Sequence, residues 1–422
     1  MPRKRSSKRK RQQDEFDRLS KVFVSRIVPI YDLFLLFQNV RDQRYKKFDK
    51  NLKSFLKKRY ITSEGKIAKL QIEHPQEFRA LIATQKELNE LIFARTRIPS
   101  AFLSLLLEEY ETFVQKCLQL YFQKKSYRLY RSDKTLSYEE ILKVNSALGL
   151  KERIFQKESK KIIDDGVSGI IKWFQHEEIQ IQNYLFDIWM LAEIFQRRNM
   201  HVHNLGRVDE KYISVLKNAE FPNHSKLKIG ERLPIDSDYL EKALEAFIES
   251  GIIIATLLWM KCSPKDKNKR MENLYELGYK LLEEHKYGCS GKVLNFAQHS
   301  SMTIGSKKEL KIINIINLAT AYKLSGDRKK FKSTLSLINR TELDERFQFA
   351  IAVLEHKYVL ASELMKKIGR NGSIRRDDYH EWPLLAKFRK TKLFIKTYKG
   401  IFGDNYNFKS PFTSRVFKNI DL

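Results

Sequence analysis

The chain contains few of the residues that interrupt or cross-link a fold. Its 422 residues include 9 prolines, 16 glycines and 3 cysteines. So few prolines and glycines argue against an all-β protein, which needs a tight turn after each strand. The cysteines, Cys117, Cys262 and Cys289, are an odd and widely spaced set, which argues against a disulfide scaffold and a cysteine-based zinc site. We therefore expect a reducing, cytoplasmic location.

Long apolar segments are also missing. The longest apolar run, residues 251–260, has about half of the roughly 20 residues that a membrane span requires. We expect it to be part of a buried helix. The basic residues 1–11 are not followed by the apolar stretch of a secretory signal. The sequence thus predicts no membrane partner.

Acidic residues are fewer than basic ones: the chain has 51 Asp and Glu and 80 Lys and Arg, which gives a formal net charge of +29. Such a charge favours polyanions, nucleic acid first and anionic membrane surfaces second. A lysine-rich coding bias would give the same composition without a function. Residues 1–20 are especially basic, and we expect a disordered tail, because like charges repel one another. Whether this tail is a nucleic-acid-binding arm or only a solvated segment stays open.

The residues that are abundant favour an all-α fold. Leu, Ile, Lys, Glu and Phe fill long uninterrupted stretches, and 42% of the residues are hydrophobic. Residues 21–99 form a helical N-terminal region in which apolar residues recur at three- and four-residue steps. Its basic part, residues 41–59, has interleaved aromatic residues; this suits RNA binding, but also an amphipathic helix with a solvated face. The recurring apolar residues are Ile27, Ile30, Leu33, Leu36 and Val40.

Ile98-Pro99 predicts a domain boundary, after which residues 100–260 form a second domain. We expect helices over residues 100–122, 184–204 and 240–259, and a capped helix start at Ser137. The helix 184–204 should end near Gly206, which suits the left-handed conformation.

Residues 261–422 form a third region, in which short helices alternate with polar turns such as Ser325-Gly326-Asp327. Helix pairs recur at the ~34-residue period of TPR-like repeats. Such repeats usually offer a concave surface for a partner; an irregular helical domain without a ligand is the alternative. The expected helices span residues 272–284, 312–324, 330–338, 348–356, 359–368 and 384–398.

The segment with the clearest chemical potential is residues 192–204. A helical projection at ~100° per residue places Ile188, Leu191, Phe195 and Val202 on one buried stripe. Arg198 flanks one edge of that stripe, and Asn199 and His203, four residues apart, flank the other. We therefore expect these three side chains in a groove against another helix. The remaining residues, Glu193, Arg197, Met200 and His201, are expected to point away, with a surface ion pair between Glu193 and Arg197 and a surface position for His201.

Arginine, asparagine and histidine together suit RNA cleavage by the 2′-OH. That reaction needs groups that accept and donate protons, and positive charge on the crowded phosphate. Histidine titrates near neutral pH, and arginine presents a permanently charged planar fork. Asn199 and His203 could equally form a structural pair, because such residues often share a helix by chance.

The segment also resembles the Arg-x4–6-His motif of HEPN domains, at Arg198, Asn199 and His203 within Arg198-Asn199-Met200-His201-Val202-His203. Its flanks are similar too: Glu193 and Arg197 upstream, and Gly206, Val208 and Tyr212 downstream. The resemblance covers about residues 100–260. It implies a helical bundle that pairs with a second copy to form one composite site.

The resemblance further implies that Arg198 and His203 are the catalytic pair, that Asn199 supports them, and that Glu193 occupies the position of an auxiliary polar residue. It implies a metal-independent endoribonuclease that needs no cofactor, with RNA as substrate, a homodimer as assembly and a defence or growth-arrest role. A regulatory protein partner is expected at the C-terminal repeats. Two alternatives are a non-catalytic helical adaptor that dimerises and binds nucleic acid or a protein, and a DNA-binding protein.

Overall fold

The computed structural model describes residues 14–57, 60–63, 66–70, 74–126, 146–184, 187–222, 224–303, 305, 307–341 and 343–407, and they are almost entirely helical. This confirms the all-α prediction. The chain forms two compact units. One comprises Leu19–Ile254, and the other comprises the described residues of Met1–Arg18 and Ala255–Leu422.

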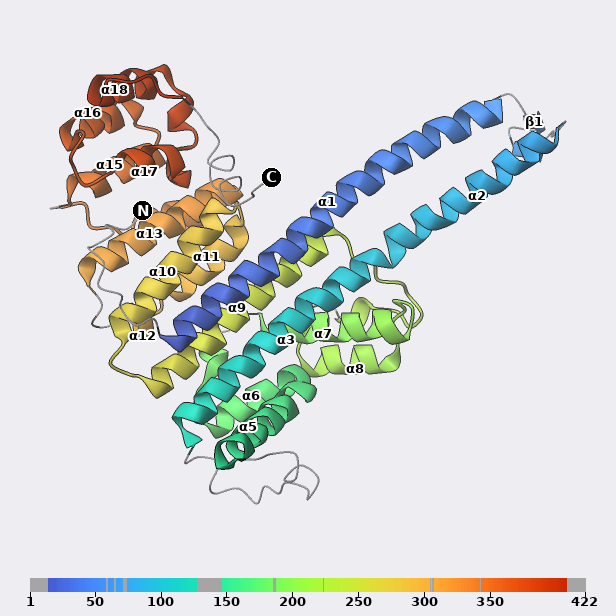
Figure 1. Cartoon of the computed structure of the whole chain (residues 1–422), viewed down its shortest axis with the longest axis horizontal. Coiled ribbons are helices and arrows are strands. Elements are labelled where there is room, and N and C mark those ends of the chain that lie inside the picture. The colour runs from blue at the N-terminus through green and yellow to red at the C-terminus, as the bar shows by residue number, and fades with distance from the viewer. Residues whose placement is uncertain are drawn as a thin grey trace. The chain divides into compact units, whose positions relative to one another are not determined.

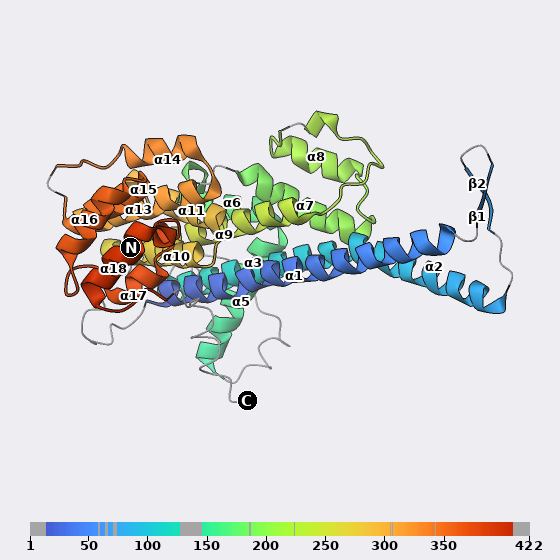
Figure 2. The same ribbon diagram turned by 90° about the horizontal axis from the view of Figure 1, so that it is seen from above.

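In the first unit, the long helix α1 (Glu15–Lys57) and the helix α2 (Pro75–Thr96) run antiparallel as a paired arm (Figure 1). Arg44 of α1 joins the two by ion pairs to Glu87 and Glu90, at 3.6 and 2.8 Å. At the far end of the arm lies a small hairpin of β1 (Tyr60–Ser63) and β2 (Lys66–Leu70), which pair antiparallel (Figure 2). The prediction of continuous helical structure over this stretch was wrong, because residues such as Ile61, Thr62 and Ile67 are β-branched and favour strands.

The other end of α1 packs on α3 (Ile98–Lys124) and α9 (Ser237–Cys262). The rings of Phe23 and Phe113 stack with centroids 4.1 Å apart. Gly251 lies against this stack, and a Cβ atom there would come within 3.0 Å of the Phe23 ring and 3.1 Å of the Phe113 ring. A glycine in the middle of α9 is thus explained by close helix packing, although it weakens the helix intrinsically.

The apolar stripe predicted for α1 was wrong in its outer half. Ile27 is fully buried, but Leu33, Leu36 and Val40 are more than half exposed. The residues that pack instead include Val24, Tyr31 and Phe34. Three- and four-residue spacing fits more than one face of a helix this rich in apolar residues, so periodicity could not select the face.

The remaining elements of this unit surround α3 and α9. They are α5 (Ala147–Asp164), α6 (Gly166–His176), η2 (Ile181–Asn183), α7 (Ile188–His203), α8 (Glu210–Asn218) and η3 (His224–Lys226).

Two predicted boundaries differ from the structure. A helix break does occur at Arg97, and Pro99 lies in the first turn of α3, but both sides of the break belong to the same unit. The predicted disordered tail of residues 1–20 is wrong for its last part, because α1 begins at Glu15. Residues 1–13 and the predicted cap at Ser137 lie outside the described residues.

The helix α9 is, among the described residues, the one helix long and apolar enough to cross a membrane by length and composition. In its most apolar window, 89% of the residues are buried within the protein. This confirms that the apolar run in residues 251–260 belongs to a buried helix.

The second unit contains helical hairpins. Two of them have the same turn: His285 and His356 both adopt positive φ, at 60° and 58°. In each turn the histidine Nδ1 shares a 2.7 Å hydrogen bond with the tyrosine two residues later, Tyr287 or Tyr358. The sequence Glu-His-Lys-Tyr is therefore an internal repeat. A third hairpin turns at Gly326, whose φ of 87° confirms the predicted glycine turn.

The hairpins are α10 (Lys267–Glu283) with α11 (Tyr287–Phe296), α13 (Lys308–Ser325) with α14 (Arg328–Leu335), and α15 (Glu345–Leu354) with α16 (Tyr358–Ile368). The other helices of this unit are the short α12 (Ser300–Thr303) and α17 (Arg376–Glu381), and α18 (Lys392–Phe402).

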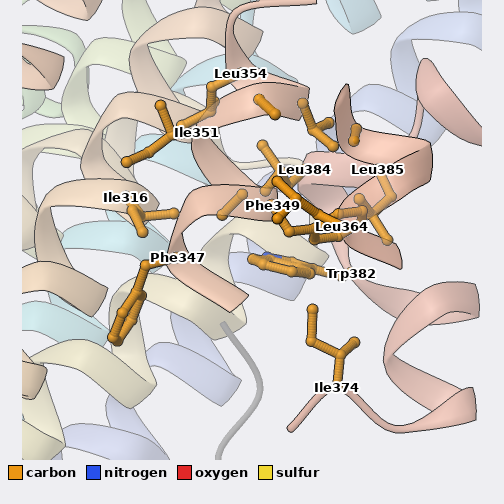
Figure 3. Packing of buried hydrophobic residues seen from close by; sticks show 14 of the residues in the cluster. Ile316, Phe347, Phe349, Ile351, Leu354, Leu364, Ile374, Trp382, Leu384 and Leu385 are labelled. Carbon is orange, nitrogen blue, oxygen red and sulfur yellow. The ribbon is translucent and has the colours of Figure 1, made fainter. Parts of the chain in front are cut away.

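The last hairpin is closed by a cluster of large apolar residues around Phe349 and Trp382 (Figure 3). Arg389 is buried there, and its guanidinium donates hydrogen bonds to the backbone oxygens of Tyr379 and Trp382. The helix predicted over residues 384–398 was wrong in its first half. Two short 3-10 turns, Pro383–Leu385 and Phe388–Lys390, precede α18, which begins only at Lys392.

We expect Phe349→Ala to lower the free energy of unfolding of the second unit by about 3–5 kcal/mol, because the fully buried ring would leave a cavity. Urea denaturation followed by tryptophan fluorescence measures this, since Trp382 lies 6.3 Å from the Phe349 ring. Val359, which is 68% exposed in the same unit, is the control; Val359→Ala should change stability by less than about 0.5 kcal/mol. Equal losses in both variants would contradict this core assignment.

Candidate ribonuclease site around α7

The helix α7 carries the four predicted site residues and ends as expected. The backbone N–H groups of Asn204 and Gly206 both donate to the carbonyl oxygen of Met200, and Gly206 has a φ of 77°. A Cβ atom at Gly206 would lie 2.7 Å from the ring of His201. Both the backbone conformation and the close approach therefore require glycine here.

Glu193 is buried in a network of polar side chains. Its carboxylate is only 1% exposed and accepts three hydrogen bonds of 2.6 Å, from Arg197 Nε, Tyr212 Oη and Tyr239 Oη. Arg197 also donates to the backbone oxygen of Pro234 and stacks over the Tyr239 ring. Burial and the Glu193 carboxylate raise the pKa of Tyr212 and Tyr239, so both phenols remain protonated donors.

The prediction that Glu193, Arg197, Met200 and His201 point away from the core was therefore wrong. Glu193 and Arg197 do form an ion pair, but it is buried rather than at the surface. His201 is 7% exposed, and its Nε2 lies 2.8 Å from the backbone oxygen of Leu233. Met200 packs into a small core with Val208 and α8. The segment after α7 folds back over this face, which a projection of one helix could not show.

Arg198 and Asn199 line a cleft of about 960 Å³ formed by α3, α5, α6, α7 and α8. The Nη1 group of Arg198 donates a 2.9 Å hydrogen bond to the Asn199 side-chain oxygen. The Nε atom of Arg198 is buried and has no hydrogen-bond partner among the described residues. The Arg198 guanidinium therefore lines the cleft, while its Nε–H group is unpaired and shielded from solvent.

His203 lies at the last position of α7, where it is exposed, and it is not part of the cleft lining. It follows Asn199 by four residues, which places it about 6 Å further along the helix axis on the same side. Val202, predicted to be buried, is 53% exposed. The end of α7 therefore presents a histidine and an apolar side chain to the surface.

The cleft is mixed in charge. Its lining includes the carboxylates of Glu111, Asp164, Asp165 and Glu220, and the cations Arg198 and Lys211. The acidic residues therefore exceed the basic ones here, although the whole chain has a net charge of +29. Among the described residues, no group of three or more His, Cys, Asp or Glu side chains is placed to hold a metal ion.

Two residues of this region were missed by the sequence analysis, Glu111 and Tyr239. Glu111 had a signal, because it occupies an apolar stripe of α3 between Leu107, four residues earlier, and Val114, three residues later. The sequence carried no signal for Tyr239, because only folding brings its Oη atom within 2.6 Å of the carboxylate of Glu193, 46 residues away.

Comparison of the chain with protein-family models, with curated proteins and with solved structures found no match.

We expect Glu193→Gln to destabilise the first unit by about 3 kcal/mol or more, because Arg197 would keep its buried charge without a counter-charge. Thermal and urea denaturation measure the loss. Glu210→Gln, at an exposed position of α8, is the matched control and should leave stability within about 0.5 kcal/mol. A Glu193→Gln protein as stable as the wild type would show that the carboxylate charge is not needed.

The free energy of unfolding should depend on pH through the protonation of His201. Burial, opposed by the hydrogen bond to Leu233 and aided by nearby arginines, lowers the pKa of His201 below its usual 6.5. The unfolded chain therefore binds a proton more readily, and stability contributed by neutral His201 is lost as pH falls below about 6.5. Unfolding titrations between pH 8 and 5 should show a weaker pH dependence for His201→Gln than for the wild type. Identical slopes would contradict the assignment.

Proposed function

We propose that the chain is an HEPN-type endoribonuclease that cuts RNA by attack of the 2′-OH, without a metal ion. The observation that supports this most directly is that the Arg198 guanidinium lines an open cleft, five residues before the exposed His203 on the same helix. The reaction needs a fixed cation and a titratable ring within reach of one phosphodiester. The helix α7 carries one residue of each kind, Arg198 and His203.

In this proposal each site residue has a separate task. Arg198 stabilises the negative charge that develops on the phosphate oxygens, and Asn199, which accepts a hydrogen bond from Arg198 at 2.9 Å, fixes its orientation. His203 takes the proton of the 2′-OH. Glu193 acts on the site only indirectly, through the buried network that holds α7 in place. The products are a 2′,3′-cyclic phosphate and a 5′-hydroxyl end.

The exposed position of His203 outside the cleft lining supports a site shared between two copies. A homodimer that joins the exposed ends of two α7 helices would bring both histidines toward the clefts. The helical hairpins of the second unit, proposed to be TPR-like, would bind RNA or a regulatory protein partner, and a role in defence or growth arrest follows only by analogy.

A second candidate function, a non-catalytic adaptor that binds nucleic acid or a protein, is favoured by the carboxylates of the cleft. Glu111, Asp164, Asp165 and Glu220 outnumber Arg198 and Lys211, and like charges repel an RNA phosphate. RNA binding with no change in RNA length over hours would favour the adaptor. A preference for duplex DNA over RNA at one stated salt concentration would indicate a DNA-binding protein instead.

We expect RNA cleavage in the presence of EDTA to fall by a factor of about 100 or more in His203→Ala, because a proton-transfer group is lost, and in Arg198→Ala, because phosphate charge is no longer stabilised. Sequencing of the RNA ends and detection of the cyclic phosphate measure this. A 2′-deoxy nucleotide at the cut site should stop cleavage by the wild type.

His176→Ala is the control for His203→Ala, since the His176 side chain is 83% exposed at the end of α6. It should cut at the wild-type rate. Equal cutting by the wild type and His203→Ala would remove the ribonuclease assignment.

A further inference from the structure

One wall of the cleft is formed by α3 and carries a carboxyl group. Glu111 of α3 lines the cleft together with Arg198 and Asn199. Within the described part of the chain, no hydrogen bond or ion pair involves its carboxyl group, although the Arg198 charge acts on it. Glu111 therefore lies near the cation proposed to hold the phosphate, in an open space of about 960 Å³.

A carboxyl at this position has no evident structural role. It takes a place in the apolar stripe of α3, between Leu107 and Val114, which are both buried. Glu111 itself is only half-buried, on the wall of the open cleft, so its carboxyl group is available to a molecule bound there. Perturbed acidic groups in clefts are often the groups that exchange protons with a substrate.

The helix α7 provides only one group that can transfer a proton in the proposed reaction. RNA cleavage by the 2′-OH needs two proton transfers, one from the attacking oxygen and one to the leaving oxygen. His203 supplies one group, and Arg198 cannot supply the other, because guanidinium does not release its proton near neutral pH. Glu111, a titratable group that lines the same cleft as Arg198, can supply the second transfer.

We propose that Glu111 is this second catalytic residue, the acid that donates a proton to the 5′-oxygen as it leaves. The inference rests on the proposed ribonuclease function and adds a residue to the same site. The O2′–P bond forms while the P–O5′ bond breaks. The 2′-OH proton passes to His203, the Glu111 proton passes to the 5′-oxygen, and water then returns His203 and Glu111 to their starting states.

The electrostatics of the cleft suit this role. Burial raises the pKa of the Glu111 carboxyl; the Arg198 charge lowers it, and the carboxylates of Asp164 and Glu108 raise it further. The net rise keeps part of Glu111 in the neutral, proton-donating form at higher pH than an exposed glutamate. The other charged groups lining this cleft are Asp165 and Glu220, which act in the same direction as Asp164, and Lys211, which opposes them.

The test compares two RNA substrates, one ordinary and one with sulfur in place of the bridging 5′-oxygen at the cut site. A thiolate leaves without a proton, so an acid is needed only for the ordinary substrate. Glu111→Gln should cut ordinary RNA about 100-fold or more slowly than the wild type and cut the sulfur substrate at close to the wild-type rate. His203→Ala should be slow on both. We expect kcat of the wild type to decline at high pH as Glu111 loses its proton, and this decline should be absent in Glu111→Gln.

The matched control is Glu152→Gln, at an exposed position of α5 outside the cleft lining, which should cut both substrates as the wild type does. Glu111→Gln activity equal to the wild type on ordinary RNA would overturn the inference while leaving the ribonuclease proposal intact. An equal loss on both substrates would also overturn it, because it would indicate a structural defect rather than a missing proton donor. A wild-type protein that cuts neither substrate would end both proposals.

Discussion

The buried carboxylate of Glu193 is the interaction on which the geometry of the first unit depends. A charge that has lost contact with water is stable only when its hydrogen bonds and its counter-charge are complete. Here they come from three places in the sequence: Arg197 on the same helix, Tyr212 on α8 and Tyr239 on α9. One carboxylate therefore fixes the rotation of α7 about its own axis and the position of two neighbouring helices.

That fixed rotation decides which side chains of α7 can meet a ligand. With Glu193, Met200 and His201 covered by the segment that follows the helix, Arg198 and Asn199 are left facing the cleft. Gly206 makes the cover possible, because it lets the chain turn closely over the His201 ring. The arrangement resembles that of many sites in which a rigid, fully satisfied polar network holds a reactive face in one orientation.

The mixed charge of the cleft bears directly on the proposed reaction. The chain has a net charge of +29, yet this cleft contains more carboxylates than cations. A strongly basic pocket would hold RNA tightly without discrimination. In the proposed site a single oriented guanidinium contacts the phosphate, and nearby carboxyl groups can exchange protons with the reacting oxygens.

The sequence alone determined the helical class, the end of α7 at Gly206, the turn at Gly326 and the buried run in α9. Each of these depends on residues close together in the chain, so composition, spacing and backbone preference were enough. Spacing also placed Arg198 and Asn199 in a groove, but it placed His203 there too, and His203 is exposed outside the cleft lining.

Tertiary structure decided the rest. The projection of α7 assumed one buried stripe, but packing covers a second face, which buries Glu193 and His201 and exposes Val202. The outer half of α1 likewise kept its apolar spacing while Leu33 and Leu36 remained exposed. Glu111 joined the site from a helix almost 90 residues away in the sequence. Periodicity describes one helix at a time, whereas burial and juxtaposition depend on where the other helices lie.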